Sequence, residues 1–557
     1  MRTSRIAARA ESRVEHRQSA APVSQPTGLT SRLLASGERG GLAGWWSFGA
    51  AVAAGLALAG AFPPVGAWPL AIVGPALLVL AVRGKRPLPA FGLGLAAGGV
   101  FFVGLLCWLI NVAWYAWVTL AVVEAVIFAV ATLALPPLLR LRAWPLAVAG
   151  WWVAQEAARD RIPWGGFPWG RLAMSQAAAP TAGWSAIGGP PWLTFLLALA
   201  GATLAYLIVR RTAISAALAV LAVAAVLAGN LAWRWSPGPG PTAEVATIQG
   251  DVPHSRNLPD QLRETTVTQN HARATFALAR KVRAGQLPAP DLVIWPENST
   301  DIDPSDSPPT YQTIYLAVSA IDRPVLVGAV LAHPVRNAGQ LWLPGRGPVK
   351  IYVKRKLVPF GEVIPYRSFL MHFTSLPTLQ PVNFTAGHRA VVFHIGKIRL
   401  GDVICYEVGF DDLVRSEVTA GANLLTVQTN DADFELDGQR GETLQQLQMA
   451  RMDAITTGRA VAVASTIGIS AIIAPDGAII TQSGTWVRAE LEARVPLVSA
   501  LTPADRVGDW PELTITALTV LALLLAIACA WPLRRHREGQ HRESQHREKQ
   551  GKSQPAD

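Results

Sequence analysis

Apolar residues collect in eight runs along the chain, separated by short polar connections. The runs are Leu42–Phe62, Trp68–Val82, Leu88–Ile110, Trp114–Leu139, Ala143–Glu156, Pro191–Val209, Thr212–Ala232 and Leu513–Leu533. A helix needs roughly 20 apolar residues to cross the hydrocarbon core of a membrane. The second and fifth runs are shorter and need neighbouring protein to complete a span. The pattern predicts a bundle of eight transmembrane helices.

Basic residues in the connections agree with this prediction. They cluster before the first run and after the second, fourth, sixth and eighth runs, so eight successive crossings place all of them on one side. Membrane proteins keep such basic loops on the cytoplasmic side. The long region Pro241–Pro511 then lies on the outer, periplasmic face. We therefore expect a multi-pass protein of the inner (cytoplasmic) membrane.

The outer region has a different pattern, in which short Val/Ile-rich runs alternate with helical stretches. The predicted strands are Glu244–Gln249, Leu292–Trp295, Pro324–Val330, Ala390–Phe393, Ile398–Ile404, Asn423–Thr429 and Val461–Ser465. The predicted helices are Gln261–Arg283 and Glu442–Arg459. This alternation is typical of packed layers of sheet and helix. A smaller outer piece is predicted at Arg159–Ser185, where IPWGGFPWG suits an irregular loop at the membrane interface.

These patterns divide the chain into five parts. Residues 1–41 form a basic, disordered cytoplasmic arm, 42–240 the first seven helices, 241–511 the outer α/β domain, 512–533 the eighth helix and 534–557 a basic cytoplasmic tail. The arm is polar and has no periodicity, so it cannot bury enough apolar surface to fold alone.

Composition supports a membrane protein. Hydrophobic residues make up 51% of the chain and charged residues 16%, against roughly 25% charged residues in soluble domains. The net charge of +11 could indicate nucleic acid as a partner. The basic residues lie in the tails and the short connections, however, so we assign them to membrane orientation and expect no nucleic-acid binding.

Three residues of the outer region could carry chemistry. Glu297 follows the predicted strand Leu292–Trp295, where α/β sites are often built, although such residues commonly lie in solvated turns. Lys354 has basic neighbours, which is also typical of a surface strand. Cys405 follows a strand and could be a buried small hydrophobe, or a thiolate stabilised by an adjacent cation. Together they fit an activated nucleophile, with Glu297 as base and Lys354 facing the developing oxyanion.

The positions of the three cysteines bear on the role of Cys405. Cys107 and Cys529 lie in apolar runs, which leaves Cys405 as the single thiol of the outer region. A disulfide framework is therefore excluded there, and a lone reactive cysteine is possible. The segment that follows Lys354 adds a rigid turn of Pro, Phe and Gly, which presents Glu362.

Longer motifs surround these residues. In chain order they are WWVAQEAARD, FPWGRLAMSQ, WPEN, YVKRKLVPFGE, CYE, LLTVQTNDADF, LQMARMDAITTGRAV and TPADRVGDW. In these motifs the chain resembles the nitrilase superfamily, which has an α-β-β-α sandwich and a Glu–Lys–Cys triad. Within that superfamily it resembles the apolipoprotein N-acyltransferase family. The similarity covers roughly Gly44–Leu533, so it leaves only the two tails outside.

The resemblance implies a role for each candidate residue. Cys405 would be the nucleophile, Glu297 the general base and Lys354 the stabiliser of the oxyanion. Supporting or substrate-binding roles would fall to Glu362, Tyr406 and Glu407. The implied reaction is ping-pong. A phospholipid, typically phosphatidylethanolamine, gives its sn-1 acyl chain to the cysteine as a thioester. The amino-terminal amine of an S-diacylglyceryl-cysteine apolipoprotein then takes this chain, in the last step of lipoprotein maturation.

Further expectations follow from the resemblance. The partners would be a phospholipid donor, an apolipoprotein acceptor and membrane lipid, with no metal or other cofactor, and the protein would be a monomer. Two departures from the family pattern, Leu258 and Asp433, concern substrate handling. An alternative keeps the triad but uses water as acceptor, in a membrane-tethered nitrilase-like amidase. Another alternative is a non-enzymatic transporter or scaffold, in which Cys405→Ala would leave function intact.

Overall fold

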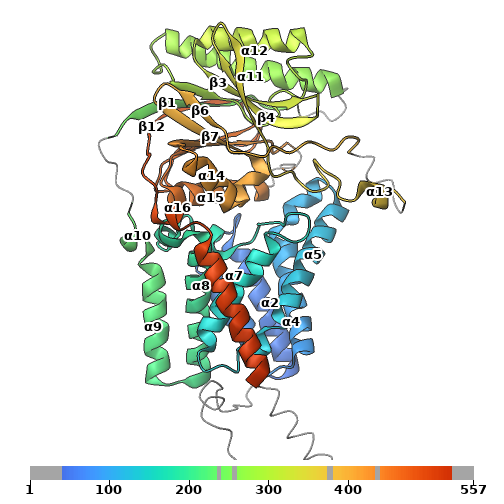
Figure 1. Cartoon of the computed structure of the whole chain (residues 1–557), viewed down its shortest axis with the longest axis vertical. Coiled ribbons are helices and arrows are strands. Elements are labelled where there is room, and N and C mark those ends of the chain that lie inside the picture. The colour runs from blue at the N-terminus through green and yellow to red at the C-terminus, as the bar shows by residue number, and fades with distance from the viewer. Residues whose placement is uncertain are drawn as a thin grey trace, which may run out of the picture.

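The structure, a computed structural model, describes residues 41–234, 240–253, 260–372, 380–432, 434 and 440–529. A helical bundle forms one half and a layered α/β domain stands on its end (Figure 1). The basic arm 1–40, the tail 530–557 and the two departures Leu258 and Asp433 lie outside the described residues.

The helices of the bundle follow the apolar runs of the sequence. They are α2 (Gly44–Ala61), α3 (Leu70–Val82), α4 (Pro87–Leu105), α5 (Trp114–Thr132), α7 (Trp144–Arg159), α8 (Ser185–Arg210), α9 (Ala213–Leu227) and an unlabelled helix at Trp510–Cys529. Short turns η2 (Cys107–Asn111), α6 (Leu135–Leu138) and α10 (Gly229–Ala232) join them. Within the described residues, five helices are long and apolar enough to cross a membrane, while α3 and α9 are shorter.

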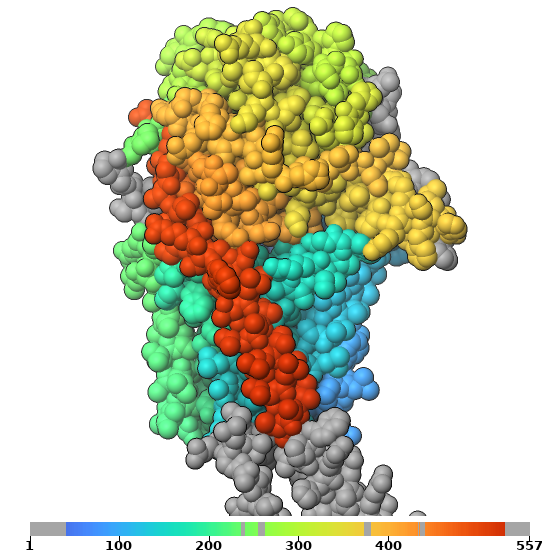
Figure 2. Space-filling view, in the orientation of Figure 1, coloured from blue at the N-terminus to red at the C-terminus, as the bar shows by residue number. Residues whose placement is uncertain are grey.

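The outer surface of the bundle is apolar. Leu56, Val130, Leu221 and Leu524 are all more than half exposed, on four different helices. Exposed apolar surface of this extent marks contact with a partner or a membrane. The helix Trp510–Cys529 runs along the outside of the bundle, where Figure 2 shows it directly beneath the α/β domain. The bundle is therefore a membrane-embedded part.

Helix α8 contains a break near its start. Gly188 and Gly189 leave the helical conformation, and Gly189 has φ 77° and ψ 173°, which a residue with a side chain rarely adopts. Pro190 and Pro191 then begin the long second piece of the helix, in the first-turn positions where proline is tolerated. The predicted run Pro191–Val209 corresponds to this second piece.

The outer domain contains two sheets, each with six strands among the described residues. The first has the order β12-β1-β2-β3-β4-β5 and the second the order β11-β10-β9-β8-β7-β6. The strands are β1 (Thr242–Gln249), β2 (Leu292–Ile294), β3 (Val325–Leu331), β4 (Arg336–Leu343), β5 (Gly347–Val353), β6 (Val392–Ile395), β7 (Ile398–Ile404), β8 (Leu424–Thr429), β9 (Val461–Ser465), β10 (Ala471–Ile473), β11 (Ile479–Gln482) and β12 (Ala489–Pro496). In each sheet three parallel strands, β1–β3 and β7–β9, are flanked by antiparallel ones.

Helices cover the outer face of each sheet. Helices α11 (Asp260–Arg283) and α12 (Pro308–Ile321) cover the first sheet, away from the bundle (Figure 1). Helices α14 (Asp411–Thr419) and α15 (Gly441–Thr457) lie under the second sheet and face the bundle. An apolar core with members from both sheets fills the space between them. The α-β-β-α sandwich that the resemblance implies is therefore present.

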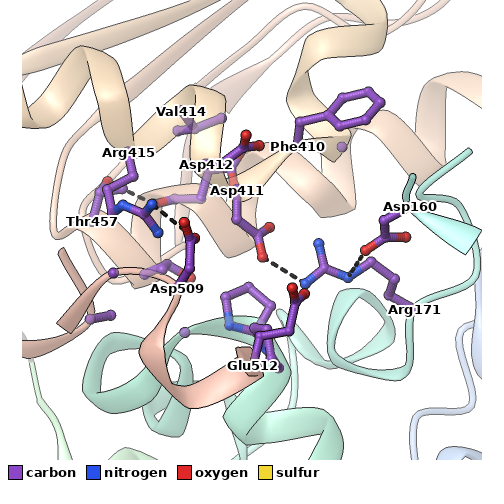
Figure 3. Close-up of a pocket in the computed structure, with 18 of the residues that line it drawn as sticks. Asp160, Arg171, Phe410, Asp411, Asp412, Val414, Arg415, Thr457, Asp509 and Glu512 are labelled. Carbon is purple, nitrogen blue, oxygen red and sulfur yellow. Dashed lines mark hydrogen bonds and ion pairs between the residues drawn. The ribbon is translucent and has the colours of Figure 1, made fainter. Parts of the chain in front are cut away.

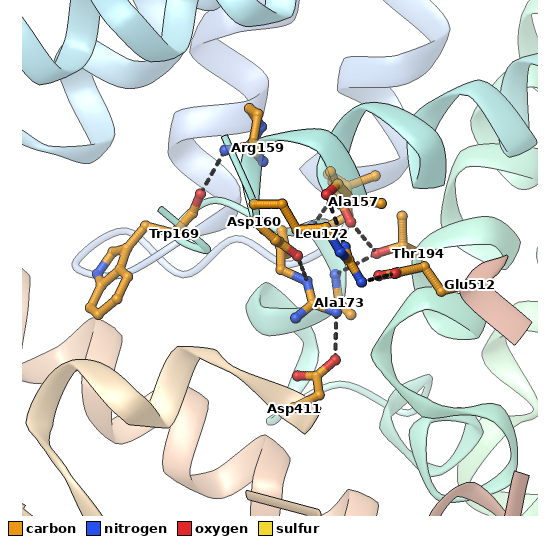
Figure 4. A network of polar contacts seen from close by, with 12 residues as sticks. Ala157, Arg159, Asp160, Trp169, Leu172, Ala173, Thr194, Asp411 and Glu512 are labelled. Carbon is orange, nitrogen blue, oxygen red and sulfur yellow. Dashed lines mark hydrogen bonds and ion pairs between the residues drawn. The ribbon is translucent and has the colours of Figure 1, made fainter. Parts of the chain in front are cut away.

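The loop between α7 and α8 is irregular, as predicted, with two short turns, η3 (Leu172–Gln176) and η4 (Ala182–Trp184). A buried polar network holds it (Figure 4). Arg159 donates to Glu124 at 3.1 Å and to the Trp169 carbonyl at 2.9 Å. Glu124 is an ionisable residue inside the apolar run Trp114–Leu139, and it anchors this loop through Arg159. The side chain of Arg159 is itself only 1% exposed.

Candidate active site

Glu297 is placed by the turn that ends strand β2. Pro296 stops the strand, and the chain then crosses directly over Gly328 of β3. A Cβ atom on Gly328 would lie 2.1 Å from the Pro296 carbonyl oxygen, so only glycine permits this crossing. The turn brings Glu297 inside the domain, where it is 5% exposed. The solvated-turn interpretation of this residue is therefore wrong.

Lys354 directly follows edge strand β5 and turns inward. Strand β5 exposes most of its side chains, as a surface strand does, but Lys354 is 1% exposed. Its Nζ donates to Glu297 Oε1 at 2.9 Å and to Glu362 Oε1 at 3.0 Å. Asn337 of β4 donates to the same two oxygens, at 2.6 Å and 3.0 Å. Two donors thus hold two carboxylates in one cluster.

The cluster keeps its lysine charged. Burial alone would lower the pKa of Lys354, but the carboxylates of Glu297 and Glu362 outweigh it and hold this pKa well above its usual value. Burial raises the pKa of Glu297, and the neighbouring Glu362 raises it further, while Lys354 opposes both. A carboxylate with a raised pKa is a stronger base, which suits the acceptance of a proton from a thiol.

Cys405 lies at the junction of strand β7 and the short turn η6 (Cys405–Gly409). Its φ of 52° falls in the left-handed region, which is uncommon for a residue with a side chain. Such backbone strain clusters at functional sites because the surrounding fold must impose it. The side chain is 7% exposed, and Gln446 Nε2 of α15 lies 3.5 Å from its Sγ.

The surroundings of Cys405 disfavour its thiolate form. Burial and the negative charge of Glu297 raise the pKa of Cys405 well above its usual value, and Lys354 only partly offsets them. Lys354 acts in the expected direction, because its positive charge lowers the pKa of the thiol, but burial outweighs it. The largest cause is burial, which removes the water that would solvate a thiolate. Attack by this sulfur consequently requires a base, and the Glu297 carboxylate is close enough to act on it electrostatically.

Glu407 ties the cysteine turn to the lysine segment. Its Oε2 accepts from the Ile404 N–H and the Tyr352 hydroxyl, both at 2.8 Å. Its Oε1 accepts from the backbone N–H groups of Arg355 and Lys356, at 2.6 Å and 3.0 Å. The residues before Cys405 and after Lys354 therefore hold one carboxylate in common, which fixes the distance between the two segments.

Tyr406 faces the membrane bundle instead. Its hydroxyl donates to the Gly166 carbonyl at 2.5 Å, and its ring stacks on Trp169 with centroids 5.6 Å apart. Phe410 contacts the same ring edge-on at 5.1 Å. The predicted supporting residues thus divide: Glu362 and Glu407 serve the charged cluster, while Tyr406 joins the site to the loop between α7 and α8.

Three further residues belong to this site and were not predicted. Asn337 bridges the two carboxylates, the Asn430 backbone N–H donates to Glu297 Oε2 at 3.0 Å, and Gln446 contacts the thiol. No sequence signal distinguishes Gln446 from the other buried polar residues of helix α15. The described residues contain no group of three His, Cys, Asp or Glu side chains placed to hold a metal ion. The chemistry available is that of a thiol, a base and a fixed cation.

Known proteins resemble this chain across both of its parts. The model of the apolipoprotein N-acyltransferase N-terminal domain matches residues 54–203, and that of the carbon-nitrogen hydrolase matches residues 245–502. The apolipoprotein N-acyltransferase of Mycolicibacterium smegmatis is 34% identical over 86% of this chain and 84% of its own length. That of Azotobacter vinelandii is 31% identical over 89% and 96%.

A solved structure of an amidase from Nesterenkonia sp. covers 47% of this chain and 95% of the amidase, with 16% identity and a TM-score of 0.33. The family of this chain is shown instead by the two relatives above 30% identity, which the chain matches over most of their length. The chain therefore belongs to the apolipoprotein N-acyltransferase family, and it is a membrane-associated acyltransferase with a nitrilase-like carbon-nitrogen hydrolase domain.

Proposed function

We propose that Cys405 carries the acyl group as a thioester, with Glu297 as general base and Lys354 as stabiliser of the oxyanion. The observation that carries this proposal is the buried cluster of Glu297, Lys354 and Glu362, in which Glu297 and Lys354 act electrostatically on the Cys405 thiol. A neutral thiol needs a base, and the base must be held before substrate arrives. The cluster supplies both the base and a cation fixed for the charge that develops.

The first half of the reaction takes an acyl chain from a phospholipid. Glu297 takes the Cys405 proton, and the sulfur attacks the ester carbonyl carbon. Lys354 stabilises the negative oxygen. When this intermediate collapses, the ester C–O bond breaks, Glu297 returns its proton to the leaving alkoxide, and lysophospholipid departs. We propose the sn-1 chain of phosphatidylethanolamine as the donor.

The second half transfers the chain to an amine. The amino-terminal nitrogen of S-diacylglyceryl-cysteine attacks the thioester carbonyl, and Glu297 takes a proton from that nitrogen. The C–S bond then breaks, and the proton passes to the Cys405 sulfur. Water must be kept from the thioester between the two halves. The burial of Cys405 supports this exclusion.

Membrane placement completes the proposal. Helices α3, α7 and α9 join the five longer helices as an eight-span bundle, and the domain 241–511 stands on its periplasmic side. The parts 1–41 and 534–557 lie in the cytoplasm, 42–240 and 512–533 in the inner membrane. Within this arrangement Glu362 and Glu407 position the charged cluster, Tyr406 docks the domain on the bundle, and the protein acts as a monomer without a cofactor.

Acyl transfer is tested with purified protein, labelled phosphatidylethanolamine and a diacylglyceryl-cysteine peptide. We expect an added mass of one acyl chain on Cys405 and, after peptide is added, N-acylated peptide. The Cys405→Ala variant should give neither. Lysophospholipid with free fatty acid and no acylated peptide would instead identify a hydrolase that uses water.

The placement of the domain is tested separately. Asp322 is exposed at the end of α12, far from the bundle. We expect a cysteine introduced by Asp322→Cys to react with a membrane-impermeant maleimide once the outer membrane is opened. Labelling only after the inner membrane is broken would reverse the proposed orientation.

A further inference from the structure

Helix α15 has two groups of buried polar side chains. Asp453 and Thr457, in its second half, line a cavity at the seam between the bundle and the catalytic domain. Figure 3 shows Arg171 paired with Asp411 at this seam. Gln446, in the first half of the helix, instead contacts the sulfur of the proposed nucleophile. The first half of α15 therefore belongs to the proposed catalytic centre.

The amide nitrogen of Gln446 has two neighbours. Gln446 is 3% exposed, and its Nε2 lies 3.5 Å from Cys405 Sγ. The same nitrogen donates to Oε1 of Glu442, which lies one helical turn earlier. An amide nitrogen carries two hydrogens. Gln446 can therefore donate one hydrogen bond to the carboxyl group and the other to the sulfur.

Glu442 is itself bound to a second buried carboxyl group, that of Asp431. Burial raises the pKa of Asp431, while hydrogen bonds from Glu442 and from three hydroxyl groups lower it. The hydroxyl groups belong to Thr429, Ser465 and Thr443, at 3.0 Å, 2.5 Å and 3.3 Å from the Asp431 oxygens. A hydrogen bond between two carboxyl groups requires that one of them holds a proton.

The hydroxyl groups determine which of the two carboxyl groups holds this proton. The oxygens of Ser465 and Thr443 accept backbone N–H groups of the loop after β9, at 2.7 Å and 2.8 Å. Each hydroxyl therefore uses its single hydrogen to donate to Asp431. Donors on every side favour the ionised form of Asp431, so we assign the shared proton to Glu442.

This assignment fixes the orientation of the Gln446 amide. The nitrogen and oxygen of an amide are told apart by the hydrogen bonds that they make. With its proton turned to Asp431, Glu442 presents an accepting oxygen to Gln446. If the amide were rotated by half a turn, two accepting oxygens would face each other in a buried site and both would be unpaired. The N–H end of Gln446 is therefore the end that faces Cys405.

A donor at this position acts where the thiolate needs support. Burial disfavours the thiolate most strongly, and the titratable side chains that act on the sulfur are Glu297, Lys354, Glu442 and Asp431. Of these four, only Lys354 favours the thiolate. A hydrogen bond to the charged form of a group stabilises that form. The Gln446 N–H therefore acts in the same direction as Lys354, without a charge of its own.

Negative charge appears on the sulfur twice in the proposed reaction. It appears when Glu297 takes the Cys405 proton, and again when the C–S bond breaks and its electron pair returns to the sulfur. The Gln446 N–H stabilises the sulfur at both moments and keeps its own proton throughout. Glu297 remains the group that removes and returns the protons.

We propose that Gln446 is a further catalytic residue, whose N–H stabilises the Cys405 thiolate, and that Glu442 and Asp431 are positioning residues that orient its amide. The inference rests on the proposed role of Cys405 as nucleophile and adds the group that supports its sulfur.

The thiolate is measured without any lipid, by the rate at which iodoacetamide alkylates Cys405 across a range of pH. Peptide mass spectrometry separates this site from the other two cysteines. Gln446→Met removes the donor at similar volume, so the midpoint of the pH profile should rise and alkylation below it should slow about tenfold. The matched control is Gln448→Met on the same helix, whose amide contacts Arg451. It should change neither quantity.

The orientation of the amide is tested at Glu442. Glu442→Leu should also slow alkylation, by less than Gln446→Met does, because the Gln446 amide becomes free to rotate. Glu442→Gln should restore most of the rate, since its amide accepts from Gln446 and donates to Asp431 as the protonated acid does. Faster alkylation in both Glu442 variants would mean that this carboxyl group is ionised, and it would overturn the positioning role.

These outcomes are distinct from a failure of the proposed function. An unchanged melting temperature shows that each variant is folded. If folded Gln446→Met keeps the pH midpoint of the parent protein, Gln446 does not support the thiolate and the inference is overturned, while Cys405 keeps its role. If Cys405→Ala still forms N-acylated peptide, the proposed function itself is wrong.

Discussion

The two sheets of the sandwich supply opposite kinds of group to one site. The first sheet supplies charge: Glu297 after β2, Lys354 after β5 and, between them, Asn337 of β4. The second sheet supplies the thiol at the end of β7, whose pKa is raised by burial. The charged groups hold one another in place before substrate arrives, whereas the thiol is placed by a left-handed backbone residue whose turn Glu407 ties to the lysine segment. The fixed charges and the nucleophile are therefore positioned by different sheets of the sandwich.

The largest effect on activity is expected when Cys405, the nucleophile at the end of a strand of the second sheet, is replaced. Cys405→Ala should abolish both the acyl mass on the protein and the N-acylated peptide, because nothing else in the site can carry the chain. Cys405→Ser should also be severely slow, since an alkoxide is much harder to form than a thiolate. Intact-protein mass spectrometry and product assays measure both. N-acylated peptide made at the normal rate by either variant would contradict the thioester route.

The next effect concerns the base on the first sheet. Glu297→Gln should slow acylation of Cys405 by about 10²–10⁴-fold, the usual contribution of general-base catalysis. The matched control is Glu490→Gln, which removes an ion pair with Lys281 at 2.8 Å on the same sheet. Single-turnover acylation separates this step from amine attack. Equal rates for the two variants would remove Glu297 from the mechanism.

Lys354→Met should lower the rate by about 10²–10³-fold, as the loss of one oxyanion donor does. It should also lower the melting temperature, because Glu297 and Glu362 would face each other without their cation. Breaking a buried pair in this way costs about 3–5 kcal/mol. Lys354→Arg, which keeps the charge, serves as the control for stability. A stable Lys354→Met variant would show that the cluster is not held by this charge.

A smaller effect is expected at the link between the sheets. Glu407→Gln replaces one accepting oxygen by a donor that faces backbone N–H groups or the Tyr352 hydroxyl. We expect a loss of about 1–3 kcal/mol of stability, the cost of leaving a buried polar group unpaired. The rate should fall only as far as the Cys405 turn moves relative to Lys354. A larger loss of rate than Glu297→Gln causes would assign Glu407 a direct chemical role.

The smallest expected change is in pH dependence. Acylation requires ionised Glu297, and burial and Glu362 raise the pKa of this carboxyl above its ordinary value of 4.5. The rate should therefore fall as the pH is lowered, with the midpoint of the fall above that ordinary value. Glu362→Gln removes one negative neighbour, so the acid limb should move to lower pH. An unchanged acid limb in this variant would mean that another group controls it.

The sequence predicted the apolar helices and all six parallel strands of the two sheets, because the local residue pattern of each agrees with its structure. Strand β4 was not predicted from the sequence. Its segment RNAGQLWL contains Asn and Gly, which are depleted in strands. It is extended because it pairs with β3 on one side and with β5 on the other. Asn337 lies in this strand, and the sequence did not identify it as a site residue for the same reason. The raised pKa of Cys405 could not be predicted either, because it depends on burial and on the approach of Glu297 once the sheets have packed.

One apolar cluster runs through both halves of the molecule without interruption. It includes Leu58 and Phe102 of the bundle, Trp169 of the loop, and Val403 and Met452 of the catalytic domain. The two family models match different parts of the chain, but these parts share one apolar core and form one folding unit. Heat should unfold bundle and domain in a single cooperative transition. The domain released by cutting near residue 240 should aggregate, because the face beneath its second sheet would meet water. A protein that kept only the catalytic half would need other side chains on the face beneath its second sheet, where this chain packs against the bundle.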